Sequence, residues 1–296
     1  MIEAQHVGFA YPGCPDVLRD VTVSLERGGR LAVVGENGSG KTTLARLLCG
    51  LVEPTAGTVR VDGRDTCDPA AIYEIRRRVG LVFQDPEDQI VETTVEREVA
   101  FGPRNLGLSL DEVDRRVREA LATFGINGLA KRPCHLLSAG EKQLVAVASV
   151  FVMQPEYIIL DESTSLLDGR SRRALAAAIE RLLHETGAGL IFISMRLEDI
   201  WTCDSVVFLR DGLVDFRGSR ADFLRHLVAL GMPLGGLGLL ATKLEEAVPG
   251  FLQALDRRPL SSESLAGVLE QLARRGSGTG GLGDRSAGAE GGAVCP

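Results

Sequence analysis

The sequence predicts an α/β fold in which a mainly parallel sheet is covered by helices, with a smaller helical appendage. The first observation is a strand–loop–helix stretch in which residues 35–42 read GENGSGKT, the pattern G-x-x-x-x-G-K-S/T. The second is that short apolar runs alternate along the chain with amphipathic stretches of helical period, as in parallel sheets covered by helices. The third is the length of 296 residues, which is enough for one large domain and an appendage.

The N-terminal part of the chain is expected to be rich in strands that wrap the loop. A turn is expected at residues 11–15 (YPGCP), and the stretch from Thr43 to Cys49 after the loop is predicted to be a helix. Strands are predicted over residues 2–9, 17–25, 30–34, 59–63 and 79–83. The last of these strands leads directly to Gln84.

The middle of the chain changes to a helical pattern, from about residue 94 to residue 152. One helix is expected to begin near Asp111 with Ser109 as its N-cap, and another to start at Ala139. After it, the sequence predicts strands over 157–160, 189–194 and 206–209, and a helix over 170–185. Residues 219–275 are expected to be helical outside this unit, and the Gly-rich residues 276–296 to be disordered.

The overall composition argues against several classes of protein. The formal net charge of -7 disfavours wholesale nucleic-acid binding, so no nucleic-acid partner is expected. No apolar run approaches the ~20 residues that a membrane span needs, and residues 1–4 show no leader pattern. We therefore expect a soluble protein that reaches a membrane only through a partner.

The loop at residues 35–42 has the chemistry of a phosphate-binding site. Glycines let its backbone turn successive N–H groups inward, and the N-terminus of the following helix adds partial positive charge. Lys41 is expected to reach the β- and γ-phosphates of a nucleotide, and the Thr42 hydroxyl to hold Mg²⁺. The predicted nucleotide-binding residues of this stretch are Gly35, Asn37, Gly38, Ser39, Gly40, Lys41, Thr42 and Thr43.

Two adjacent carboxylates, Asp161 and Glu162, follow the apolar run at residues 157–160. A nucleotidase with such a loop needs one carboxylate to orient Mg²⁺ or its water ligands, and a second group to polarise the attacking water. Adjacent positions at the end of a strand can divide these two roles. A solvated acidic pair at a strand end is the alternative interpretation.

The order of the motifs resembles the ATP-binding cassette (ABC) ATPases, the nucleotide-binding subunits of ABC transporters, over roughly residues 1–218. Residues 35–42 match the Walker A motif of that family, and Asp161 and Glu162 match Walker B and the catalytic glutamate. The remaining matches are Tyr11 to the adenine-stacking A-loop aromatic, Gln84 to the Q-loop glutamine, residues 137–141 (LSAGE) to the signature, and residues 165–168 (SLLD) to the D-loop.

The resemblance implies a P-loop ABC fold with an N-terminal antiparallel β subdomain, a helical signature subdomain over about residues 85–153 and a C-terminal helical extension. It implies ATP and Mg²⁺ as ligands, with Gln84 and Asp161 beside the metal and Glu162 and Gln84 as catalytic residues. It adds Ser138, Gly140 and Asp168 to the nucleotide site, with the signature capping the γ-phosphate bound by a second cassette. The resemblance also implies that the chain binds an integral membrane transporter subunit. It would then lie peripherally at the cytoplasmic face of the membrane.

Residues 82–103 narrow the resemblance to the energy-coupling factor (ECF) ATPases, which drive vitamin and transition-metal-ion uptake, including cobalt and nickel systems. Those proteins typically show F-Q-N-P-x-x-Q followed by T-V-x-x-x-V-A-F-G, and Asp85 replaces the usual asparagine here. A generic ABC importer with a degenerate site is the alternative. The transported solute is not encoded in these motifs.

Two departures from the family pattern bear on mechanism. Aligning the family's switch region on Asp204 places Met195 at the histidine position, although a slip in register would bring Arg196 there. In the signature, Ala139 replaces glycine and Glu141 replaces glutamine, and Glu141 is unfavourable near a polyphosphate unless it points outward or pairs with a cation such as Lys142. We therefore hypothesise a heterodimer of unlike cassettes in which this chain's own site is slow; a homodimer stays open.

Other functions compatible with the motifs are a subunit that holds ATP mainly to complete its partner's site, a soluble ABC protein of repair or translation, and a P-loop kinase. The last two are disfavoured because the chain lacks long inserts or a second cassette, and because it carries the signature and D-loop. Residues 219–275 are interpreted as a region that contacts the partner cassette, with a packing appendage as the alternative.

Overall fold

The computed structural model describes residues 1–165, 167–194, 200, 202–231, 242–246, 250–255 and 266–268. Met195 and Arg196 of the switch position, Leu166 of the D-loop match and residues 276–296 lie outside the described residues. None of the helices in the described part is long and apolar enough to cross a membrane. The described residues cover most of residues 1–218 and pieces of the C-terminal region.

The N-terminal sheet is antiparallel, as the family resemblance implies. It contains β1 (Ile2–Ala10), β2 (Asp16–Leu25), β4 (Ala56–Val61) and β5 (Arg64–Asp65), in the order β2-β1-β4-β5. Its strands bury every second side chain, for example Val21, Val23 and Leu25 of β2, because alternate residues of a strand point to opposite faces. One face of this sheet therefore belongs to the core and the other to solvent.

The second sheet is mainly parallel, and its parallel strands are mostly apolar. Its order is β10-β9-β3-β8-β7-β6, with parallel pairing from β9 to β6 and β10 antiparallel to β9. The strands are β3 (Arg30–Gly35), β6 (Val79–Val82), β7 (Tyr157–Asp161), β8 (Gly189–Ile193), β9 (Ser205–Arg210) and β10 (Leu213–Gly218). Since the carboxyl ends of parallel strands meet at one edge, Gly35, Asp161 and Gln84 are brought to the same side of the sheet.

Alternate residues of the parallel sheet face two different cores. Val33 of β3 packs in a cluster with α1 (Lys41–Leu48) and the N-terminal sheet, so α1 lies between the two sheets. Val34 belongs to the cluster on the opposite face, with α5 (Ala139–Phe151), α6 (Gly169–Thr186) and α8 (Arg220–Ala229). Both faces of the sheet are thus covered, as predicted for an apolar parallel sheet.

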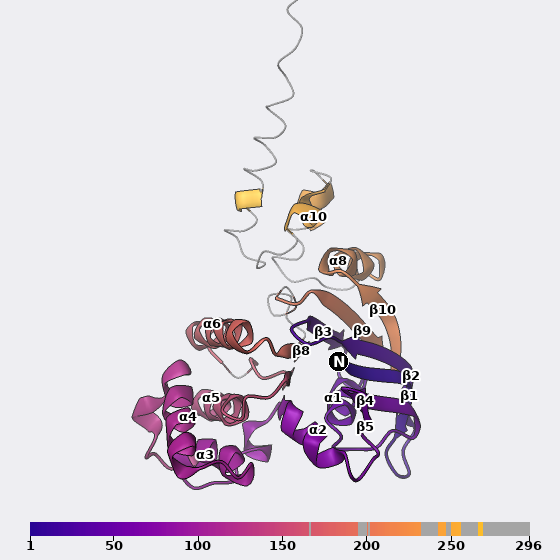
Figure 1. Cartoon of the computed structure of the whole chain (residues 1–296). Coiled ribbons are helices and arrows are strands. Elements are labelled where there is room, and N and C mark those ends of the chain that lie inside the picture. Colours follow the sequence, from indigo (N-terminus) through magenta and orange to yellow (C-terminus); the bar gives the residue numbers. More distant parts are fainter. Residues whose placement is uncertain are drawn as a thin grey trace, which may run out of the picture.

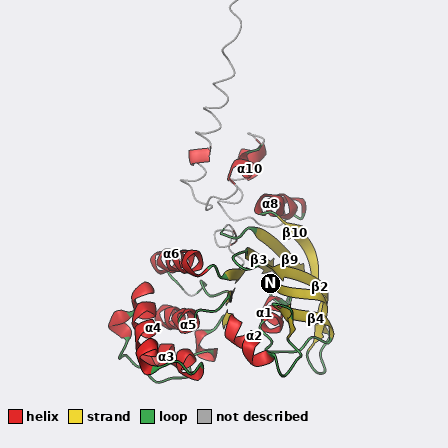
Figure 2. Cartoon of the chain, viewed as in Figure 1, coloured by secondary structure: helices red, strands yellow, loops and turns green. Residues whose placement is uncertain are grey.

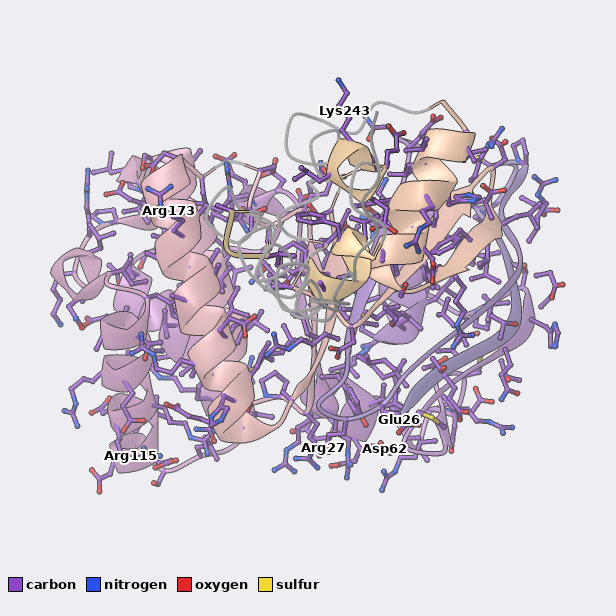
Figure 3. All side chains as sticks on the ribbon, turned by 90° about the horizontal axis from the view of Figure 1, so that it is seen from above. Glu26, Arg27, Asp62, Arg115, Arg173 and Lys243 are labelled. Atoms are coloured by element: carbon purple, nitrogen blue, oxygen red, sulfur yellow. The ribbon has the colours of Figure 1, made fainter. Side chains whose placement is uncertain are left out.

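A helical lobe, defined as residues 86–151, stands beside the sheets (Figure 1). It consists of η1 (Pro86–Asp88), α3 (Val95–Asn105), α4 (Leu110–Thr123), η2 (Asn127–Leu129), η3 (Cys134–Leu136) and α5. The predicted N-cap of α4 is confirmed, because the Ser109 hydroxyl accepts the Glu112 N–H. Figure 2 shows α3, α4, α5 and α6 together on one side and the strands on the other. From above, Arg115 and Arg173 mark the helical side and Asp62 the strand side (Figure 3).

Helix α2 (Ile72–Arg78) and strand β10 are among the elements that were not predicted from the sequence. Helix α2 buries only Ile75, so it carries almost no apolar stripe to reveal its period. Strand β10 is an edge strand whose residues are half-buried or exposed, and the sequence predicted only the turn before it. Both elements are held by their neighbours rather than by a strong pattern of their own.

The described pieces of the C-terminal region pack onto the protein's own core. Helix α10 (Phe251–Leu255) buries Phe251 and Leu252 completely, in the cluster that also contains Phe223 and Leu224 of α8. Glu245 reinforces this packing, because it accepts hydrogen bonds from Arg225 of α8 and from the Leu252 N–H. The prediction of a helical region is confirmed for these pieces, and contact with a partner cassette remains a prediction.

Candidate active site

The loop after β3 requires glycine at two positions for steric reasons. A Cβ atom on Gly35 would lie 2.3 Å from the Leu209 carbonyl oxygen and 2.4 Å from Ser39 Oγ. Gly40 is the N-cap of α1 with φ 100°, and a Cβ there would lie 2.4 Å from Leu18 Cδ2. The loop is therefore wedged between β9, β2 and α1, and its shape is fixed by packing.

The substitution Gly35→Ala is expected to destabilise the protein, because Leu209 O is a backbone atom of a buried strand and cannot move aside. Overpacking of this kind typically costs about 1–3 kcal/mol. At about 2–4 °C for each kcal/mol in a chain of this size, the melting temperature should fall measurably in thermal unfolding. Gly128→Ala is the matched control, because a Cβ there meets no atom of the described residues within 4 Å. Equal melting temperatures for the two variants would contradict the steric argument.

The Lys41 side chain is buried and lies against the loop itself. Its Nζ donates to the carbonyl oxygens of Gly35, at 2.8 Å, and Glu36, at 2.9 Å. Burial lowers the pKa of Lys41, while the nearby carboxylates of Glu162 and Asp161 act in the opposite direction. An ammonium has three N–H donors, so one is left to reach a phosphate oxygen.

A cavity of about 320 Å³ opens in front of the loop. This volume lies within the range of about 300–1,000 Å³ that is typical of small-molecule sites. The cavity brings together most of the predicted loop residues, the predicted Q-loop glutamine and the second carboxylate. Its lining residues are Val17, Asn37, Gly38, Gly40, Lys41, Thr42, Thr43, Gln84 and Glu162.

Glu162 projects from the end of β7 in a backbone conformation that is uncommon for residues other than glycine. Its φ is 47°, and its N–H donates to the Ile193 carbonyl at 2.9 Å. Such conformations cost roughly 1–3 kcal/mol and occur often at functional sites. The turn brings the Glu162 carboxylate to Gln84, whose Nε2 donates to Glu162 Oε2 at 3.2 Å. The carboxylate and the amide thus sit together at the mouth of the cavity.

Asp161, one residue earlier, is only 3% exposed. Burial raises the pKa of this carboxyl, although a hydrogen bond with Thr42 and the charge of Lys41 oppose the shift. Its Oδ1 has no hydrogen-bond partner among the residues that the structure describes. A buried carboxylate oxygen of this kind, beside a threonine hydroxyl, fits a hard cation such as Mg²⁺.

The rest of a Mg²⁺ coordination shell cannot come from a protein cluster in the described part of the chain, where no group of three or more His, Cys, Asp or Glu side chains converges. Mg²⁺ usually keeps several waters and is held by one or two carboxylates together with substrate phosphates. Asp161, Thr42 and the phosphates of a nucleotide on the loop therefore form a chemically suitable donor set.

Tyr11 lies beside α1 but does not line the cavity. Its hydroxyl lies 3.4 Å from Thr43 Oγ1 and accepts a hydrogen bond from Arg46 Nη1 at 3.3 Å. Its ring packs edge-on against Phe9, with ring centroids 4.8 Å apart. The ring is therefore held next to the phosphate loop, where an extended nucleotide could reach it.

The signature residues cap the N-terminus of α5 in the helical lobe. The Ser138 hydroxyl accepts the Glu141 N–H, and Glu141 Oε2 accepts the Ser138 N–H at 2.8 Å, which is a complete capping box. The cation that pairs with Glu141 is Arg132, at 3.2 Å, whereas Lys142 pairs with Glu87 of η1. Glu141 is thus turned back onto its own helix end, and these contacts lower its pKa.

The predicted site residues do not all gather in one place. Ser138 and Gly140 lie at the start of α5, and this helix stands in the helical lobe, apart from α1 (Figure 1). Asp168 precedes α6 and accepts hydrogen bonds from the N–H and hydroxyl of Ser171, at 2.8 and 3.1 Å. Arg132 was missed from the sequence, because only the turn at η3 brings it onto Glu141.

Residues 18–165 match a protein family described as ABC transporter. The chain is 45% identical over 240 residues to the cobalt import ATP-binding protein CbiO of Syntrophus aciditrophicus, which covers 79% of this chain and 85% of the relative. It is 37% identical over 276 residues to the energy-coupling factor transporter ATP-binding protein EcfA1 of Lacticaseibacillus paracasei, covering 92% and 98%. A solved structure of cbiO1 from Clostridium perfringens, part of the ABC transporter complex cbiONQ, has a TM-score of 0.68 at 28% identity and covers 85% of this chain and 97% of that one.

Proposed function

Because the chain belongs to the family of ABC transporter ATP-binding subunits, we propose that it is the ATPase that energises an ECF-type uptake transporter. The observation that carries this proposal is the single cavity in which Lys41 and Thr42 face Gln84 and Glu162. The named relatives support the ECF type, and a generic importer with a degenerate site is not favoured. A vitamin or a transition-metal ion is the proposed class of solute.

The proposal gives each predicted residue a role in ATP hydrolysis. Lys41 and the inward N–H groups of the loop hold the β- and γ-phosphates, and Tyr11 stacks on adenine. Thr42, Asp161 and Gln84 would hold Mg²⁺, which would supply positive charge beside the phosphates. Glu162 accepts a proton from the attacking water, which Gln84 orients. The remaining residues of the site are Gly35, Asn37, Gly38, Ser39, Gly40, Thr43, Ser138, Gly140 and Asp168.

The location of the signature supports a dimer. Ser138 is exposed and Gly140 half-buried at the N-terminus of α5, so the nucleotide of a second cassette could reach this helix end, where its phosphate would displace the Glu141 carboxylate from the Ser138 N–H. The altered residues Ala139, Glu141 and Met195 favour an unlike partner over a second copy. In this arrangement residues 1–218 form the ATPase domain, residues 85–153 its helical subdomain, and residues 219–275 a region toward the partner cassette.

A groove beside the helical lobe supports docking of an integral membrane subunit. This docking groove has a volume of about 440 Å³, and its walls include Tyr73, Leu81, Gln89, Val91, Phe101 and Met153. Tyr73 and Val91 are 60% and 66% exposed, which is unusual for large apolar side chains in one groove. A peripheral position on the membrane follows, because the chain would be held there by its partner.

The substitution Phe101→Asp tests this docking. We expect it to remove the membrane subunit from a complex purified through a tag on this chain, because Phe101 is 43% exposed in the groove and a carboxylate there would have to be desolvated. Leu110→Asp is the matched control, since Leu110 is 74% exposed on α4 and does not line the groove. Retention of the membrane subunit by Phe101→Asp, or its absence from the wild-type complex, would argue against the proposed docking.

A further inference from the structure

The segment from Gln84 to Glu92 connects the catalytic cavity to the helical lobe. At its first residue, Gln84 donates to the Glu162 carboxylate. At its other end, the N–H groups of Val91 and Glu92 donate to Glu98 Oε2 of α3, at 2.9 and 2.7 Å. Glu98 is only 3% exposed, so this anchor is well protected from water. Hydrogen bonds therefore hold the segment at both ends. The contacts made by its middle residues determine how the two ends move relative to each other.

Gln89, in the middle of this segment, uses both ends of its side-chain amide to bridge distant elements. Gln89 Oε1 accepts the Phe83 N–H at 3.1 Å, and Phe83 is the residue directly before Gln84. Gln89 Nε2 donates to the Ala146 carbonyl of α5 at 2.7 Å and to Ser149 Oγ at 3.1 Å. One amide thus joins the end of β6 to the middle of α5.

A second contact binds the same segment to α5. Lys142 of α5 forms an ion pair with Glu87 of η1, which lies two residues before Gln89 in the chain. Counted from Ala139 at the start of α5, Lys142 lies about one turn along the helix, and Ala146 and Ser149 lie about two and three turns along it. A shift of α5 along or across its axis therefore carries η1 and Gln89 with it.

We infer that Gln89 is a positioning residue that couples the place of the signature-bearing helix α5 to the Gln84–Glu162 contact. The inference rests on the proposed function, in which α5 carries Ser138 to the partner's nucleotide and the membrane subunit occupies the docking groove. Gln89 also lines that groove, so an occupant of the groove acts directly on the bridge. Through Gln89, closure of the dimer and docking of the membrane subunit both set the distance between Gln84 and the catalytic carboxylate.

The test compares ATP turnover of the purified transporter complex containing wild-type chain, Gln89→Leu or Gln89→Glu. In each complex the partner cassette carries glutamine in place of its catalytic glutamate, so that the turnover measured is that of this chain's own site. Gln89→Leu removes all three hydrogen bonds of the amide. We expect kcat to fall roughly tenfold, the effect of about 1.4 kcal/mol, while the KM for ATP stays within about twofold because the phosphate loop is untouched. Gln89→Glu keeps the acceptor for the Phe83 N–H but sets a carboxylate oxygen against the Ala146 carbonyl, so kcat should fall in this variant too. A parallel fall of kcat and rise of KM in both variants would overturn the inference in favour of a general structural defect.

A double-mutant cycle of Ser149→Ala with Gln89→Leu separates the effect of the Gln89 hydrogen bonds on kcat from the effect of side-chain packing. Ser149→Ala alone should change kcat by less than about twofold, because Gln89 retains the Ala146 carbonyl as an acceptor, and it should have no further effect in the Gln89→Leu background. Thermal unfolding identifies a variant that fails to fold, and Gln89→Asn then takes its place. If the wild-type chain hydrolyses ATP no faster in the complex than alone, the proposed function fails. If the complex accelerates wild type and Gln89→Leu equally, only the positioning role fails.

Discussion

Changing Glu162 to glutamine is expected to lower ATP turnover at this chain's own site by roughly 10²–10⁴-fold, the usual contribution of a positioned general base. ATP should still bind, because the loop N–H groups, Lys41 and Thr42 are unaffected. The amide keeps the shape of the side chain and can still accept the Gln84 hydrogen bond, so the loss isolates the ability to take a proton. Turnover by phosphate release and binding by a fluorescent ATP analogue check the two halves of this expectation.

The control for Glu162→Gln is Glu53→Gln, which makes the same chemical change at an exposed position outside the cavity. Turnover that survives in Glu162→Gln would assign proton acceptance to another group. In the complex with an unlike cassette, we expect Glu162→Gln to reduce total turnover much less than the same change in the partner, since this chain's site is proposed to be slow. If this chain's substitution alone abolished all turnover and the partner's had no effect, the slow-site proposal would be wrong.

The parts of the site that could be predicted are those formed by residues contiguous in the sequence. A loop of glycines between a strand and a helix, and carboxylates at the end of an apolar strand, indicate their chemistry locally because backbone geometry follows directly from residue type. Parallel pairing then places Gly35 and Asp161 at one edge of the sheet, which the alternation of strands and helices already implied.

The parts that were not predictable depend on side chains meeting across the fold. Arg132 reaches Glu141 only because η3 turns the chain back over the start of α5, and the sequence suggested Lys142 instead. Gln89 is the last residue of the stretch 83–89 that resembles F-Q-N-P-x-x-Q, but its partners Ala146 and Ser149 are 57 and 60 residues away. Packing between elements, which residue type alone does not specify, decides both contacts.

Burial of the ionised Asp161 carboxylate favours binding of a cation but opposes folding of the protein. The pKa of this carboxyl is raised in the folded protein, first by burial, so the charged form is less favourable in the folded state than in the unfolded chain. At neutral pH this charge therefore lowers the stability of the protein without its cation. The cost is tolerated because Oδ1, which has no partner in the described part of the chain, is the oxygen that a Mg²⁺ ion would use.

The substitution Asp161→Asn is accordingly expected to change activity and stability in opposite directions. Mg²⁺-dependent ATP turnover should fall roughly 100- to 1,000-fold, because a metal contributes several kcal/mol to the transition state of phosphoryl transfer. The melting temperature without nucleotide should rise, by about 2–4 °C for each kcal/mol gained. Turnover and thermal unfolding, measured on the same preparation, test both effects. Asp114→Asn, at an exposed position of α4, should change neither.

The pH dependence of this stability difference tests its electrostatic cause. A carboxyl with a raised pKa in the folded state lowers stability at every pH above that value, and the deficit disappears as the pH falls through it toward the unfolded value of about 3.9. The gap in melting temperature between Asp161→Asn and wild type should therefore be largest at neutral pH and shrink on acidification. A gap that is constant with pH would instead attribute the effect to packing of the amide, and a wild-type protein more stable than the variant at neutral pH would show that Asp161 is stabilised by its surroundings rather than held for a cation.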